Sequence, residues 1–233
     1  MLHNYCVTYQ NPGRRERMAH RFQTVGLDYT LVESVPATDA TIAPPHEDAL
    51  GKFNLKSYSA MCGHVMAYQQ MLADGHDMAI ICEDDVMLRR DIKQYLPTMV
   101  NYMNQYNIEI LLTGYLTTDP PLKADWSFEK HSEVFGYFNY PDGHWGVQQY
   151  IIKRSYAEHL VTHFGLEYAH RSLIDHNTTH YSTDWIITKM TDKRAMISPQ
   201  LAVEECPPDI HANSDTLYHY NCHMANYIPG LHI

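Results

Sequence analysis

Hydrophobic and polar positions along the first half of the chain predict strands that alternate with helices. Short apolar runs, which are typical of buried strands, occupy residues 2–9, 29–35, 78–82 and 108–113. Amphipathic stretches, which indicate helices, lie between them at residues 14–24, 57–74 and 91–104. Strands separated by helices in this order predict an α/β fold.

The alternation breaks after residue 116. A β-like run at residues 133–140 and a strand at 147–152 are followed by Ser155-Tyr156-Ala157-Glu158, a capping box that predicts a helix up to residue 165. We then expect a polar loop to residue 183, a short apolar helix at 185–190, and one or two short strands within 195–203. The tail from Cys206 shows no periodicity, and residues 36–53 predict a loop over one face of the sheet.

Composition excludes several classes of protein. The chain is 45% hydrophobic and 19% charged, which is ordinary for a globular domain. Its net charge of -10 argues against a nucleic-acid-binding surface, which needs a basic stripe. The apolar runs fall short of the roughly 18 residues of a membrane helix, and the start lacks a signal-peptide core. We therefore expect a cytoplasmic protein, with peripheral membrane contact still allowed.

Three consecutive acids, Glu83, Asp84 and Asp85, follow the apolar run at residues 78–82. In open α/β sheets, ligands bind at the carboxyl ends of strands. Neighbouring carboxylates repel one another, and their hard oxygens select Mg²⁺ or Mn²⁺. An ion held there could bridge the diphosphate of a nucleotide-sugar. A solvated loop, where Asp is common for turn reasons, is the alternative, and the residue types alone leave both open.

Residues 80–88, Ile-Ile-Cys-Glu-Asp-Asp-Val-Met-Leu, resemble the LxLEDDxxL segment of glycosyltransferase family 25, and residues 145–152 resemble its WGTxxYLIS segment. This family includes bacterial lipooligosaccharide glycosyltransferases and collagen galactosyltransferases. Weaker similarity to its RRExM, GCxxSH and PVDxxL segments is found at residues 14–18, 59–64 and 183–187. Thr8 stands where the family usually has Asn, and residues 56–59 replace its GEIG segment. The identity of the sugar donor is therefore the family property that carries over least well to this chain.

The resemblance implies a single GT-A domain over residues 1–233. Its Rossmann-like nucleotide-sugar-binding half, with a central mixed sheet, would span residues 1–115, and an acceptor-side half with the C-terminal tail would span 116–233. The implied activity is metal-dependent transfer of a hexose, such as galactose or glucose, from a UDP-linked donor to a hydroxyl of a glycan or glycoconjugate, with inversion.

The resemblance also implies ligands for Mn²⁺ or Mg²⁺. In the GT-A fold the last acid of the triplet touches the metal, which carries over to Asp85. Asp84 or Glu83 would act through water or contact the donor. GT-A enzymes often add a C-terminal histidine to the metal, and His211 is our candidate, although a lone loop histidine more often faces solvent.

Inverting transfer needs a base that takes the proton of the acceptor hydroxyl. Asp184 is our candidate because it precedes an apolar helix and matches the family's Asp; a helix N-terminal charge is its other role. Asp142 is the reserve base. Trp145 and Gln148 are candidate acceptor-binding residues, since an indole can stack on a sugar face, although a buried Trp is equally compatible.

Donor-binding candidates gather after the first strand. Thr8 and Tyr9 end it, and Arg14 and Arg17 follow, where guanidinium groups could pair with phosphate oxygens or form surface salt bridges.

We expect His64, which borders the apolar stripe of its helix, to be structural. His219 and His223 suit a metal only if the tail is helical, and we interpret them as incidental.

Two other functions remain open at this level. A sugar-nucleotide nucleotidyltransferase would use a similar sheet and acidic site, but it normally has a Gly-rich loop with a basic residue after the first strand. Residues 10–15, Gln-Asn-Pro-Gly-Arg-Arg, are a poor version of that loop. A non-catalytic sugar-binding or scaffold protein is the other alternative, because fold resemblance alone does not fix function.

Overall fold

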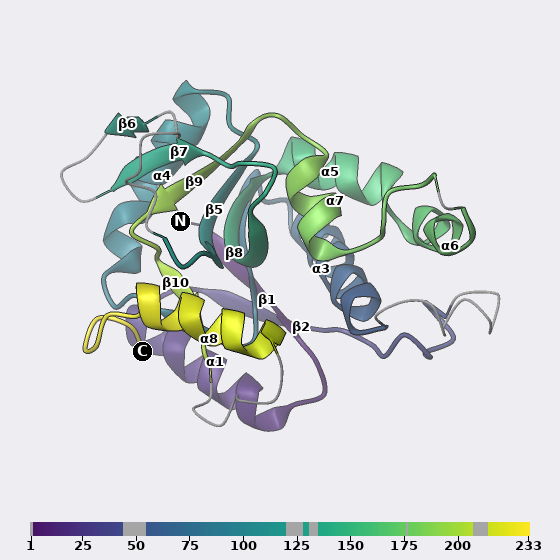
Figure 1. Ribbon diagram of the computed structural model, residues 1–233, viewed down its shortest axis with the longest axis horizontal. Helices are drawn as coiled ribbons and strands as arrows, with labels where there is room; N and C mark the ends of the chain where they lie inside the picture. The colour runs from purple at the N-terminus through teal and green to yellow at the C-terminus, as the bar shows by residue number, and fades with distance from the viewer. Residues whose placement is uncertain (1, 44–54, 120–127, 131–134, 176, 207–213) are drawn as a thin grey trace.

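A mixed sheet of eight strands runs through the centre of the protein in the order β2-β1-β3-β8-β5-β9-β7-β6 (Figure 1). The computed structural model describes residues 2–43, 55–119, 128–130, 135–175, 177–206 and 214–233. The strands of this sheet are β1 (His3–Thr8), β2 (Tyr29–Glu33), β3 (Met78–Glu83), β5 (Ile110–Leu116), β6 (Phe128–Lys130), β7 (Gly136–Asn139), β8 (Trp145–Lys153) and β9 (Arg194–Ser198).

A second, two-stranded sheet pairs β4 (Val86–Leu88) with β10 (Ala202–Glu204) in antiparallel fashion. The helices are α1 (Pro12–Val25), α3 (Leu55–Ala73), α4 (Ile92–Gln105), α5 (Arg154–His163), α6 (Leu166–Ile174), α7 (Thr183–Lys189) and α8 (Ser214–Asn226). The α/β class and the mixed central sheet expected from the sequence are confirmed.

The direction of β8 decides which residues meet at the edge of the sheet. β1 runs parallel to both β2 and β3, whereas β8 is antiparallel to its neighbours β3 and β5. Cys82 near the end of β3 is therefore opposite Gln149 in the middle of β8. The carboxyl ends of β1 and β3 and the start of β8 consequently lie at one edge.

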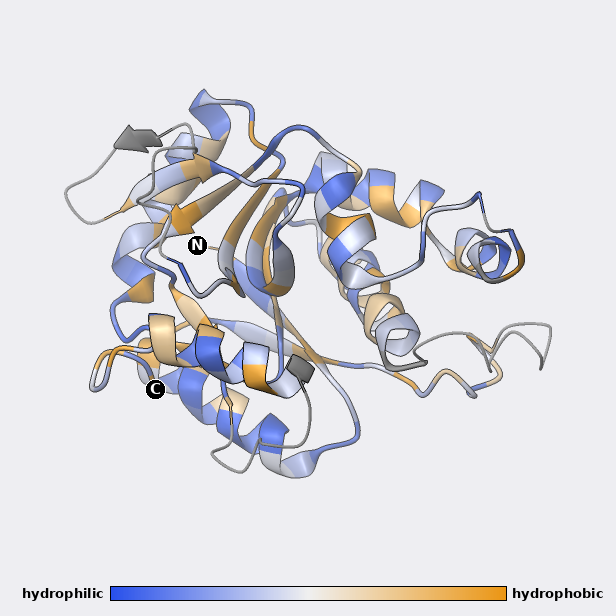
Figure 2. Cartoon of the chain, in the orientation of Figure 1, coloured by the Kyte–Doolittle hydropathy of each residue, from blue (hydrophilic) through white to orange (hydrophobic). Residues whose placement is uncertain are grey.

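Alternating side chains along the strands contribute to two hydrophobic clusters, one on each face of the sheet. On β3, Ala79 and Ile81 pack with residues of α3, α5 and α7, whereas Ile80 and Cys82 pack with residues of α1 and α4. Figure 2 shows the apolar strands enclosed by helices with hydrophilic outer faces. None of the helices in the described ranges has both the length and the hydrophobicity of a membrane-spanning segment.

Three expectations for the second half are wrong. The stretch predicted as a polar loop contains α6, which is amphipathic but only nine residues long and leaves Leu166 and Ile174 at its two ends exposed. The Ser155 capping box does not form: Lys153 precedes the helix without a side-chain cap, and Glu158 accepts a hydrogen bond from Arg154 Nε at 2.9 Å.

The tail predicted to be irregular contains α8, drawn in yellow in Figure 1, which packs against β10. Its inner face is largely polar. His223 Nδ1 lies 2.7 Å from the Glu204 carbonyl oxygen, and Asn226 donates to the Thr117 carbonyl oxygen at 2.7 Å. Docking through hydrogen bonds leaves no hydrophobic periodicity for a sequence pattern to detect.

Gly63 lets α3 approach the sheet closely. A Cβ atom at this position would lie 2.6 Å from Cγ1 of Val7 and 2.9 Å from Cβ of Ser34. We predict that Gly63→Ala lowers the free energy of unfolding by about 1–3 kcal/mol through overpacking, although alanine favours helix. Gly13→Ala in α1 is the matched control, because its nearest neighbour would be 3.6 Å away, and it should not destabilise. Equal urea midpoints for the two variants would contradict the close approach.

His232 anchors the chain beside β4, where Ile233 and Leu88 exchange backbone hydrogen bonds of 3.0 Å. Burial lowers the pKa of His232 to about 4 from its ordinary 6.5, while its Nδ1 accepts a hydrogen bond from Ile228 N at 3.0 Å. Between these values the unfolded chain binds the proton more readily than the folded one, so stability falls as the pH drops below about 6.5.

We predict that His232 contributes about 2 kcal/mol to the stability that the protein loses between pH 7 and pH 5. His232→Asn keeps an acceptor for Ile228 N and removes the titrating ring, so urea unfolding of this variant should depend less on pH. If the wild-type protein and His232→Asn lost the same free energy of unfolding between pH 7 and pH 5, His232 would not titrate as described.

Candidate active site

Arg14 joins the acids at the end of β3 to the start of α1. Its Nη1 donates to Asp84 Oδ1 at 2.9 Å and to Asp85 Oδ2 at 3.1 Å. The guanidinium is placed by local structure, because Asn11 caps α1 by accepting a hydrogen bond from Arg14 N at 3.1 Å, and Pro12 opens the helix. A basic side chain in the first turn of α1 thus reaches across the edge of the sheet to both carboxylates.

A cavity of about 600 Å³ opens at this edge, which is within the range of small-molecule sites. Its wall is formed by the end of β1, the segment after β2, one face of α3, Arg14 and the three acids. The predicted donor residues Thr8, Tyr9, Arg14, Glu83 and Asp84 line it, together with the predicted metal ligand Asp85.

Burial and neighbouring carboxylates together disfavour the charged form of Asp85 more than Arg14 favours it. Burial, Glu83 and Glu204 raise the pKa of Asp85 to about 8, and the Arg14 guanidinium opposes this shift. Its Oδ1 is buried and has no hydrogen-bond partner among the described residues. An unpartnered carboxylate oxygen in a negative environment fits a divalent cation.

The described residues provide only some of the ligands that a metal ion needs. In that part of the chain, no three His, Cys, Asp or Glu side chains converge closely enough to hold an ion. The predicted ligand His211 lies outside the described residues. Mg²⁺ sites commonly combine one or two carboxylates with phosphate oxygens and water, so Asp85 is compatible with an ion that arrives with a diphosphate.

Asp84 acts as a structural link as well as a charge. It is buried, its Oδ1 accepts from Arg14, and its Oδ2 accepts a hydrogen bond from Tyr9 N at 3.2 Å. Direct metal binding by Asp84 would require one of these bonds to be exchanged. Glu83 is more open, with 33% of its side chain exposed at the cavity.

On the second-half side of the site, Asp184 begins α7 and is held against β8. Its Oδ1 accepts a hydrogen bond from Gly146 N at 2.6 Å. Gly146 has φ +90°, and a Cβ there would lie 2.6 Å from Leu116 N, so both conformation and space require glycine. Burial raises the pKa of Asp184, the Gly146 hydrogen bond opposes the shift, and Glu83 adds to it.

Two tryptophans flank Asp184. Trp145 and Trp185 are 37% and 40% exposed, and their rings meet edge to face with centroids 5.4 Å apart. Trp185 was not singled out by the sequence, because a single Trp in an apolar helix predicts a core residue. The exposed pair beside a carboxylate offers an apolar surface of the kind that sugar rings pack against.

Five predicted residues are not part of the cavity wall: Asp184 and Trp145, and the three that follow. Asp142 is exposed and forms an ion pair with Arg194. Arg17 Nε donates to Glu205 Oε2 at 3.3 Å, and Gln148 is buried within β8. Asp142 and Arg17 are thus paired with Arg194 and Glu205 rather than with the three acids.

Sequence reasoning missed Glu204 and His219, which complete the charge pattern. His219 Nδ1 lies 2.6 Å from Glu204 Oε2, and this contact raises the pKa of His219, with smaller contributions from Asp85 and Glu83. The sequence alone predicts no role for His219 and His223, yet both contact Glu204. Their i, i+4 spacing was the available signal, and the missing apolar period of α8 concealed it.

Comparison with solved structures supports a glycosyltransferase-like fold. A glycosyltransferase involved in the glycosylation of the major capsid of PBCV-1 has a TM-score of 0.50 at 12% identity, over 96% of this chain and 100% of that chain. A197 from STIV scores 0.45 at 11% identity over 84% and 81% of the two chains. Mannose-1-phosphate geranyltransferase from Thermus thermophilus scores 0.47 at 10% identity over 84% and 74%. Of these three, the first is similar enough to support a shared fold.

The family is shown by sequence. No curated protein matches the chain. A family model described as glycosyltransferase family 25 (LPS biosynthesis protein) matches residues 1–170. That range contains the three acids, Arg14 and the Trp145-Gly146 segment, whereas Asp184, Glu204 and His219 lie beyond it. The chain belongs to glycosyltransferase family 25 and is a glycosyltransferase.

Proposed function

We propose that this enzyme transfers a hexose from a UDP-linked nucleotide-sugar to a hydroxyl group of a glycan or glycoconjugate, with inversion at the anomeric carbon. The observation that carries the proposal is the cavity at the carboxyl ends of β1 and β3, which Arg14 and Asp85 both line and where Asp85 Oδ1 has no hydrogen-bond partner among the described residues. That pairing suits a ligand with both phosphate oxygens and a bound cation.

Arg14 would bind the diphosphate. Its side chain is 39% exposed, and its guanidinium can turn from the carboxylates to phosphate oxygens, which it pairs with equally well. Asp85 would hold Mn²⁺ or Mg²⁺ through Oδ1, and the bound ion would neutralise charge that develops on the leaving diphosphate. Thr8 and Tyr9 would contact the nucleoside from the end of β1.

Asp184 would accept the proton of the acceptor hydroxyl. As the acceptor oxygen forms its bond to the anomeric carbon, the bond from that carbon to the diphosphate breaks, and the diphosphate leaves with the electron pair. A carboxylate whose pKa is raised by burial is a stronger base than one in water. Trp145 and Trp185 would support the acceptor sugar beside it.

We predict that Asp85→Asn lowers turnover by about 10²- to 10³-fold, because it removes the charged oxygen at the diphosphate. Release of UDP from UDP-glucose or UDP-galactose in Mn²⁺, with water as acceptor, measures this without knowledge of the natural acceptor. Asp192→Asn, at an exposed bend after α7, is the matched control and should keep full activity. Full turnover of the Asp85 variant with a chelator present would remove the proposed metal role.

We predict that Asp184→Asn lowers kcat by about 10²- to 10⁴-fold while UDP affinity stays unchanged, because the amide still accepts the Gly146 hydrogen bond but cannot take a proton. Turnover and calorimetric titration of UDP on the same sample separate the two effects. If turnover persisted while stability fell, Asp184 would serve only as the charge at the N-terminus of α7.

A further inference from the structure

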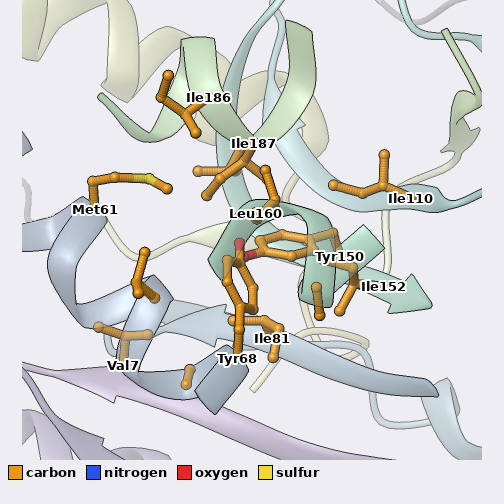
Figure 3. Packing of buried hydrophobic residues seen from close by; sticks show 14 of the residues in the cluster. Val7, Met61, Tyr68, Ile81, Ile110, Tyr150, Ile152, Leu160, Ile186 and Ile187 are labelled. Carbon is orange, nitrogen blue, oxygen red and sulfur yellow. The ribbon is translucent and has the colours of Figure 1, made fainter. Parts of the chain in front are cut away.

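A chain of buried polar groups leads from the core to the cavity. Tyr68 Oη lies 2.5 Å from Tyr150 Oη, which in turn lies 2.7 Å from Nδ1 of His64. Figure 3 shows the two hydroxyls pointing toward each other among aliphatic side chains. All three residues are fully buried, and His64 also forms part of the cavity wall.

The negative charge of Glu83 determines which group donates in each of these hydrogen bonds. The other ring nitrogen of His64, Nε2, lies 3.8 Å from Glu83 Oε1. A bare lone pair on Nε2 would face a carboxylate oxygen and be repelled, whereas an N–H there is attracted. In the neutral ring Nδ1 is then the acceptor, so Tyr150 donates to His64 and Tyr68 donates to Tyr150.

The proton placed on Nε2 has no hydrogen-bond acceptor in the described part of the protein. The distance of 3.8 Å to Glu83 is too long for a hydrogen bond. A fully buried donor without a partner is costly, and it is usually kept for a ligand or a water molecule. Here the donor and a carboxylate acceptor lie side by side at the cavity, which is the complement of a hydroxyl group.

We propose that His64 and Glu83 together recognise one hydroxyl of the transferred sugar. Nε2–H of His64 donates to the hydroxyl oxygen, and the Glu83 carboxylate accepts the hydroxyl proton. Tyr68 and Tyr150 are positioning residues that fix the tautomer of His64. The inference rests on the proposed function, because it requires a sugar in this cavity.

The transferred sugar fits better than the ribose because of where Glu83 lies. Glu83 ends β3 beside the start of β8, where Gly146 N donates to Asp184 Oδ1 at 2.6 Å, so it lies on the side where transfer would take place. A site built to hydrogen-bond a hydroxyl rejects analogues that lack it far more strongly than an apolar pocket rejects an extra group. His64 is therefore assigned a role in donor specificity.

The test compares UDP, UDP-glucose and UDP-galactose by calorimetry in Mn²⁺, with wild-type protein and His64→Phe. We expect the variant to bind the preferred UDP-hexose about tenfold more weakly and UDP equally well. An equal loss for UDP would place the contact on the ribose and overturn the assignment, as would an unchanged UDP-hexose affinity. Wild-type protein that binds none of the three would instead refute the proposed function.

Deoxy analogues of the preferred donor give a readout that a structural role would not produce. Removal of one particular hydroxyl of the hexose should weaken binding to the wild-type protein. The same removal should leave binding to His64→Phe unchanged, because the two changes remove the same hydrogen bond. Additive losses at every position of the sugar would overturn the proposal. This comparison remains valid if the variant is less stable, provided that it is folded.

Tyr150→Phe tests the positioning role with a matched control. It removes the donor to Nδ1 and should lower the ratio of UDP-hexose to UDP affinity about threefold. Tyr156→Phe removes another buried hydroxyl, which donates to the Ile187 carbonyl oxygen at 3.0 Å, and should leave that ratio unchanged. The same ratio in both variants would show that the chain of hydroxyls does not act on the site.

Discussion

The ion pair of Arg14 with Asp84 and Asp85 is the interaction on which the site depends. Like charges about 4 Å apart repel by roughly 4 kcal/mol at a protein surface, so several carboxylates at one edge need a cation. Arg14 also ties the first turn of α1 to the end of β3, which fixes the opening of the cavity. One guanidinium nevertheless does not offset burial and the neighbouring carboxylates, because the pKa of Asp85 remains raised. Additional positive charge at this edge would therefore stabilise the carboxylates.

The two halves of the chain meet at this edge because β8 is inserted antiparallel between β3 and β5. The first half contributes Arg14 and the acids, and the second contributes Gly146, Asp184 and the two tryptophans. Glu204 and His219 then close the charge pattern from β10 and α8. Buried hydrogen bonds, rather than apolar contacts, hold several of these groups in place, which makes their geometry specific.

Sequence patterns predicted the strands and helices of the first half well, since each buries a clear apolar face. The prediction that the acids follow the apolar strand is confirmed, whereas the acceptor-binding role of Trp145 stays a prediction. The phosphate role expected for Arg14 stays a prediction, and the structure adds its carboxylate partners. The helix α8 was missed because polar contacts dock it, and the environment of His64 could not be predicted because its partner Tyr150 is 86 residues away in the chain.

The most direct test of the account is a calorimetric titration of UDP into the wild-type protein, at fixed ionic strength, with Mn²⁺ and then with a chelator. The account predicts that Mn²⁺ raises UDP affinity by about tenfold or more, because Arg14 alone leaves the carboxylates under-neutralised. Equal affinity under both conditions would contradict the claim that this edge holds a diphosphate together with a metal ion.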